Sequence, residues 1–178
     1  MRRGLFAAAL VLLVAGGAQA QDITMPANIE KLASKAVENV NITLDGTLLQ
    51  IAGKFLSQDD PGQKAVKGLI GNLKAIYVRS FEFAKPGEYS DADVEPLRKQ
   101  LKAPGWSPMV NVRSARDGEN IDVFFKMEKD KVAGLVVIAA QPTELTVVNI
   151  VGPIDLDQLA SLGGHLGIPR LNIPAPRK

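Results

Sequence analysis

The spacing of hydrophobic residues divides the chain into a mainly helical first part and a strand-rich second part. In the first part, apolar side chains recur every three or four residues, which is the period of one helix face. This spacing predicts helices over Ala27–Val40 and Gly46–Leu56, and further helices that begin at Asp60 and Ser90. Asp60-Pro61-Gly62-Gln63 is a strong helix-start signal, because Asp caps a helix whose first residue is Pro. Runs of β-branched and aromatic residues predict strands over Asn39–Leu44 and Lys74–Ala84.

In the second part, apolar residues alternate or run over strand lengths between short polar turns. This pattern predicts four strands, over Ser107–Ser114, Asn120–Glu128, Lys131–Ala140 and Thr143–Gly152. Asp117-Gly118 lies between two of them and is typical of a hairpin, and parallel neighbours would need long crossovers. We therefore expect a two-layer α+β fold. Its antiparallel sheet has a C-terminal four-strand meander, and the helices pack mainly on one face.

The end of the chain predicts a closing helix and a tail. Asp155 is placed to cap a helix, and the leucines that follow fall on one side of it. The last residues hold three prolines and do not fit a helix. The sequence thus predicts a signal peptide over residues 1–20, a single α+β domain over 21–169 and a Pro-rich tail over 170–178.

The first twenty residues have the pattern of a secretory signal peptide. Arg2 and Arg3 precede an apolar run over Leu5–Val14, and Ala18-Gln19-Ala20 is a typical cleavage site. The run is shorter than the ~20 residues that a membrane-spanning helix needs. We expect cleavage between Ala20 and Gln21, a periplasmic or secreted location, and no integral membrane span afterwards.

Charge and cysteine content exclude several classes of function. The chain has 21 basic and 19 acidic residues, so removal of Arg2 and Arg3 leaves 19 of each and a net charge of zero. Without a basic patch, we expect no binding to nucleic acid or to an anionic membrane surface. The absence of cysteine excludes disulfides, thiolate metal sites and cysteine nucleophiles, and we expect no cofactor.

Three stretches resemble a bacterial family of exported proteins. They are KAIYVRSFEFAKPGEYSDADVEPLRKQLKAPGWS at Lys74–Ser107, RDGENIDVFF at Arg116–Phe125 and ELTVVNIVGPIDLDQLASLGGHLGIP at Glu144–Pro169. On these stretches the chain is similar to the family called domain of unknown function 4252, over roughly Ile29–Pro169. The resemblance implies no catalytic or ligand-binding residue.

Few residues offer catalytic chemistry. His165 is the single histidine and lacks a second histidine or a cysteine at metal-ligand spacing, so we interpret it as a solvated residue near a helix end. The glycines around it follow a helix instead of preceding one, which is typical of C-capping and not of a phosphate loop. An acidic cluster surrounds Tyr89 and comprises Glu82, Glu88, Asp91, Asp93 and Glu95. Acids in the first turn of a helix explain this cluster more simply than acid–base catalysis does.

Two functions from different classes follow. The first is a non-enzymatic binding or interaction protein of the cell envelope, with no catalytic residues. The alternative is a carboxylate-based hydrolase or isomerase that uses Glu82, Asp91 or Asp93. The near absence of residues that commonly carry catalysis favours the first.

The last two predicted strands carry apolar residues on both faces. A sheet with helices on one side and water on the other should alternate more cleanly. Three kinds of cover are consistent with this pattern: the N-terminal helix Ala27–Val40, the Pro-rich tail, or another chain. Of these we predict a second copy or an envelope protein, in contact with Val136, Ile138, Val148 and Ile150.

Overall fold

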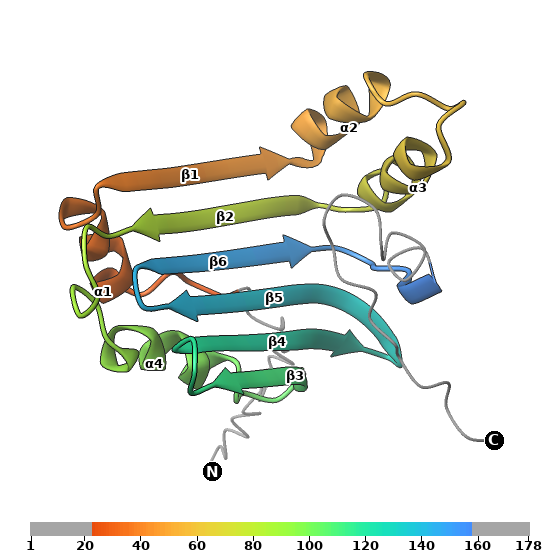
Figure 1. Cartoon of the computed structure of the whole chain (residues 1–178). Coiled ribbons are helices and arrows are strands. Elements are labelled where there is room, and N and C mark those ends of the chain that lie inside the picture. Colours follow the sequence, from red (N-terminus) through yellow and green to blue (C-terminus); the bar gives the residue numbers. More distant parts are fainter. Residues whose placement is uncertain (1–22, 158–178) are drawn as a thin grey trace, which may run out of the picture.

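A computed structural model describes residues 23–157 as one antiparallel sheet with short helices (Figure 1). Within this range the strands are β1 (Glu38–Asp45), β2 (Ala75–Glu82), β3 (Trp106–Ser114), β4 (Glu119–Glu128), β5 (Lys131–Gln141) and β6 (Glu144–Val151). The helices are α1 (Ala27–Glu30), a 3₁₀ turn (Lys31–Ser34), α2 (Gly46–Lys54), α3 (Pro61–Ile70) and α4 (Asp91–Gln100). The predicted α+β class with an antiparallel sheet is confirmed.

The strands lie in the order β1-β2-β6-β5-β4-β3. β3 to β6 pair in sequence order through short turns, and β6 then pairs with β2. β5 and β6 therefore form the centre of the sheet, whereas β1 and β3 are its edges. The described residues contain no helix that is long and apolar enough to span a membrane.

Side-chain caps begin three helices where the sequence predicted them. An Asp45 carboxylate oxygen accepts a hydrogen bond from the Leu48 amide at 2.9 Å, and Asp60 accepts one from the Gln63 amide at 2.8 Å. Ser90 and Asp93 form a capping box at the start of α4. These caps satisfy amide groups that have no partner within the helix.

The predicted helix over Ala27–Val40 is wrong in its second half. The helical conformation ends after Ser34, and β1 has already begun at Glu38. The Val37 amide donates to the Glu82 carbonyl oxygen at 2.8 Å, so pairing with β2 replaces the helical hydrogen bonds. Tertiary pairing thus overrides an apolar spacing that fits a helix.

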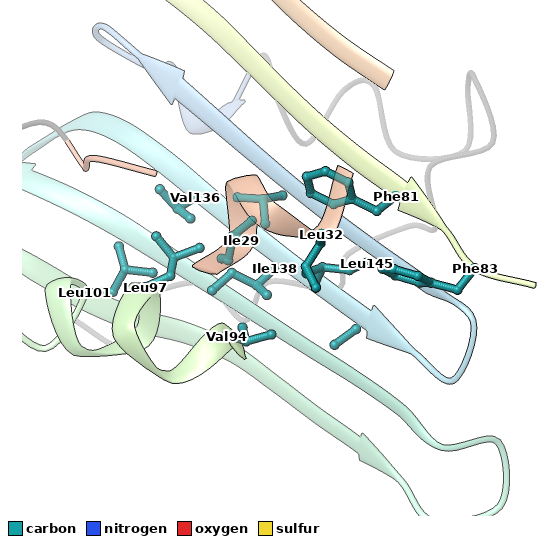
Figure 2. Close-up of a cluster of buried hydrophobic side chains, with 12 residues drawn as sticks. Ile29, Leu32, Phe81, Phe83, Val94, Leu97, Leu101, Val136, Ile138 and Leu145 are labelled. Atoms are coloured by element: carbon teal, nitrogen blue, oxygen red, sulfur yellow. The ribbon is translucent and has the colours of Figure 1, made fainter. Parts of the chain in front are cut away.

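The helices at the two ends of the sheet pack against opposite faces. At one end, α1 and α4 lie over the face that carries Val136, Ile138 and Leu145, which we call the helix face (Figure 1, Figure 2). At the other end, α2 and α3 contribute to a second buried cluster with Leu135 and Ile150. Successive strand residues point to opposite sides, so this second cluster belongs to the other face, which we call the open face. The expected packing of helices mainly on one face is therefore not confirmed.

Candidate functional site

The predicted acidic residues have structural partners. Asp91 accepts a hydrogen bond from Arg98 at 3.0 Å, and Asp93 accepts one from the Ser90 amide at 2.9 Å. Glu82 is exposed at the end of β2. Of these three acids, only Asp91 lines the nearby cleft. This arrangement does not favour the carboxylate-based hydrolase or isomerase.

That cleft has a volume of about 260 Å³ and lies beside the Tyr89 ring. The Tyr89 hydroxyl hydrogen-bonds to the carbonyl oxygens of Gln141 and Glu144, and its ring stacks on Phe83 with 5.0 Å between centroids. Burial, followed by the charge of Asp91, raises the pKa of Tyr89 to about 12. The phenol therefore joins the loop before α4 to the β5–β6 turn, and the side chain packs against the helix-face core.

A buried carboxylate joins α4 to β3 and β4. Asp122 is 3% exposed and accepts hydrogen bonds from Arg98 Nε at 2.9 Å, Asn111 Nδ2 at 2.7 Å and Arg113 Nη2 at 2.6 Å. Burial lowers the pKa of Arg98, but hydrogen bonds and attraction to Asp91 and Asp122 outweigh it, so the pKa stays above its ordinary value. Both arginines are matched by acids, which is typical of a structural cluster.

The four residues predicted to form one contact face lie on two faces. Val136 and Ile138 are fully buried on the helix face, beneath α1 and α4. Val148 and Ile150 lie on the open face, because the register pairs Val148 with Val137 and Ile150 with Leu135. Ile150 packs against the cluster beneath α2 and α3, so of the four residues only Val148 lies on the part of the open face that these helices leave uncovered.

The open face carries an unbroken row of aliphatic side chains across the whole sheet. One residue from each strand is in register with the next, in the order Ile42, Val78, Val148, Val137, Val123 and Val110. Ile42 is 41% exposed, and the other five are partly buried. We call these six residues the aliphatic row.

The two rows of side chains on either side of the aliphatic row differ in how far the helices cover them. One neighbouring row belongs to the cluster beneath α2 and α3. The other is uncharged and only partly covered, and consists of Val40, Ser80, Thr146, Ala139, Ile121 and Val112. Neither this row nor the aliphatic row contains a charged residue. The next row of the same face carries Glu38, Glu82 and Glu144, and the Glu144 carboxylate accepts hydrogen bonds from Ser80 and Thr146. The uncharged part of the open face is therefore bordered by carboxylates.

A second hollow lies on the helix face, over β2 and β6. It has a volume of about 320 Å³ and is lined by Ile23, Thr24, Met25, Tyr77, Arg79, Val147 and Asn149. We call it the Arg79 hollow. Arg79 Nη1 donates to the Val78 carbonyl oxygen at 3.1 Å, and Arg79 Nε lies 3.8 Å from a Glu30 carboxylate oxygen.

The sequence interpretation did not include the Arg79 hollow. Its signal is a polar residue at an inward position of an apolar strand, as in Asn149 of TVVNIV. In the sequence alone, a polar residue at such a position suggests that the strand is interrupted. The strand register shows instead that Asn149 pairs with Tyr77 across β6 and β2, and both residues line the hollow with Arg79.

Two sequence interpretations concern the C-terminal part of the chain. His165 lies outside the described residues. At the predicted start of the closing helix, Asp155 accepts a hydrogen bond from the Asp157 amide at 2.9 Å. Across residues 23–157, no group of three or more acidic or histidine side chains is arranged to hold a metal ion.

Comparison with known proteins gives one match. The model of a family described as "Domain of unknown function (DUF4252)" matches residues 33–162, which include every strand of the sheet. No curated protein and no solved structure is detectably similar to the chain.

Proposed function

The chain belongs to the DUF4252 family, and from that premise we propose that it is an exported, non-enzymatic protein of the cell envelope that acts through protein contact. Export is supported by the signal-like residues before Gln21. The contact surface is the open face, and the occupant we propose is a second copy of the chain. The observation that carries this proposal is the aliphatic row.

The open face suits a contact between two copies. A two-fold contact brings the same surface together from both chains, so that surface must match itself. The aliphatic row and its uncharged neighbour meet this condition, and the contact we propose is centred on them, with Glu38, Glu82 and Glu144 at its border. Sheets also pack face to face readily, at a separation of about 10 Å.

The size of the face is appropriate for such a contact. The aliphatic row crosses six strands, which at about 4.8 Å between neighbours spans roughly 25 Å. Burial of apolar surface contributes about 25 cal/mol per Å², and stable interfaces bury about 1,200–2,000 Å² in total. Contiguous exposed apolar patches larger than about a few hundred Å² are uncommon on monomeric proteins.

Replacement of Val148 by lysine tests the proposal. Val148 lies near the middle of the aliphatic row, and a lysine there places a charge in the contact. We expect the parent to sediment as a dimer and the Val148→Lys variant to sediment as a folded monomer. The control is Phe55→Lys, because Phe55 is 84% exposed at the end of α2 and is not one of the six residues of the aliphatic row.

The outcomes separate the proposed contact from the alternatives. Loss of the dimer in Val148→Lys but not in Phe55→Lys supports the proposal, provided that circular dichroism shows both variants to be folded. A monomeric parent contradicts the dimer. If the parent is monomeric and Val148→Lys is unfolded, the open face is part of the chain's own core.

A further inference from the structure

We infer that the Arg79 hollow binds a small monocarboxylate with a short apolar body. The hollow lies on the helix face, whereas the proposed contact between copies lies on the open face. The two proposals therefore rest on different residues and fail independently.

The Arg79 guanidinium has a buried donor without an acceptor. No described residue lies within hydrogen-bonding distance of Nε, although this atom is inaccessible to solvent. Nη1 is occupied, because it donates to the Val78 carbonyl oxygen at 3.1 Å and to the Ile42 carbonyl oxygen at 3.5 Å. An unpaired buried donor is unfavourable. Because water does not reach Nε, a ligand oxygen pairs it only after the guanidinium turns toward the hollow.

Glu30 neutralises Arg79 without occupying this donor. Its carboxylate oxygen lies 3.8 Å from Arg79 Nε, beyond hydrogen-bonding distance, and its side chain is half exposed. The pair therefore carries no net charge, which disfavours a dianion such as phosphate. A monoanion with two coplanar oxygens fits better, because a guanidinium edge presents two parallel N–H groups to a carboxylate.

The opposite wall supplies a second polar anchor. Asn149 is 6% exposed, and its side-chain amide makes no hydrogen bond with another described residue. An amide has both donors and an acceptor, so it can donate to a second ligand oxygen or to a protonated group nearby. Tyr77 is its cross-strand partner and places a phenol at the rim.

The remaining wall of the Arg79 hollow is apolar. Ile23, Met25 and Val147 contribute side chains that cannot hydrogen-bond to a ligand, and the volume of about 320 Å³ lies at the small end of ligand sites, which span about 300–1,000 Å³. Small-molecule sites usually combine a mostly apolar lining with a few polar groups. The ligand class is therefore a carboxylate attached to a short aliphatic or aromatic group.

Titration with hexanoate tests this inference. Binding is followed by nuclear magnetic resonance, through the Arg79 Nε–H and Asn149 side-chain amide signals, with hexanol as the neutral probe and inorganic phosphate as the dianionic one. We expect saturable hexanoate binding, with hexanol and phosphate weaker by about tenfold or more, since one hydrogen bond to a charged group is worth that factor. Arg79→Gln should reduce hexanoate affinity by about tenfold or more, for the same reason.

Two further variants distinguish ligand binding from general electrostatics. Glu30→Gln should strengthen hexanoate binding, because it removes a negative charge that repels the ligand carboxylate beside Arg79. Glu95→Gln makes the same charge change on α4, where Glu95 pairs with Lys102, and should leave the affinity unchanged. Equal binding of hexanoate and hexanol, unchanged affinity in folded Arg79→Gln, or no saturable hexanoate binding would each overturn the inference.

Discussion

Removal of the Asp122 carboxylate should destabilise the protein strongly. The side chain is 3% exposed and accepts three hydrogen bonds, from Arg98, Asn111 and Arg113. Breaking a buried ion pair costs about 3–5 kcal/mol, because the remaining partner keeps an uncompensated charge. In Asp122→Ala, Arg98 keeps Asp91 at 3.0 Å and Arg113, which is 44% exposed, can turn to water. We therefore expect a loss near the lower limit, about 3 kcal/mol of unfolding free energy.

Urea unfolding at neutral pH measures this loss. The midpoint should fall while the slope stays constant, which identifies a change in stability and not in the unfolded state. Arg113→Ala is the matched control and should cost under about 1 kcal/mol, because an exposed partner contributes little. A double-mutant cycle between Asp122→Ala and Arg98→Ala should give a coupling of roughly 1–3 kcal/mol. The reasoning is refuted if Asp122→Ala costs no more than Arg113→Ala.

Three other predictions concern different parts of the molecule. The pKa of Tyr89 is raised from 10.0 to about 12, so its contribution to stability is complete below pH 10 and is lost as the pH rises toward 12. Tyr89→Phe should remove this alkaline loss and the high-pH step in phenolate absorbance, whereas unchanged titration would contradict the assignment. Gly152 has φ 129°, and an added Cβ would lie 2.8 Å from the Lys74 amide nitrogen, so Gly152→Ala should cost about 2 kcal/mol or more in a thermal melt. Gly87→Ala, with φ 88° and open space, should cost only about 1 kcal/mol, and equal losses would refute the steric argument. Intact-mass analysis of the exported protein should show Gln21 as the first residue, and retention of residues 1–20 would rule out the predicted cleavage.

Local signals in the sequence were sufficient for most elements of the fold. Caps and turns fix helix starts and hairpins within a few residues, and Asp60, Ser90 and Asp117-Gly118 act in this way. The helix predicted over Ala27–Val40 was too long because its apolar spacing is local, whereas the hydrogen bond from Val37 to Glu82 joins residues far apart in the chain. No local pattern reports such pairing.

The residues of the contact face could not be derived from the sequence, because a shift of one residue in the pairing of β5 with β6 changes which side chains share a face. A three-residue β5–β6 turn that closed Ala140 on Glu144 would put Val136, Ile138, Val148 and Ile150 on the same face. The chain instead closes Gln141 on Glu144, so even-numbered residues of β5 share a face with odd-numbered residues of β6. A shift of one residue exchanges the two faces of a strand. The Arg79 hollow was missed for a related reason, because β2 and β6 lie far apart in sequence and meet only in the sheet.

The contact between two copies is tested most directly by a single introduced cysteine. The chain has none, so Val148→Cys carries one thiol near the middle of the aliphatic row. In a two-fold contact centred on this row, the two introduced thiols face each other across sheets about 10 Å apart, which is farther than a disulfide can span. A bismaleimide whose reactive ends are roughly 10 Å apart should therefore link the two chains into a dimer on a denaturing gel. Glu95→Cys on α4 is the control and should remain monomeric on the gel. Equal crosslinking of both variants, or no crosslinking of Val148→Cys at concentrations where the parent sediments as a dimer, would contradict the proposed contact.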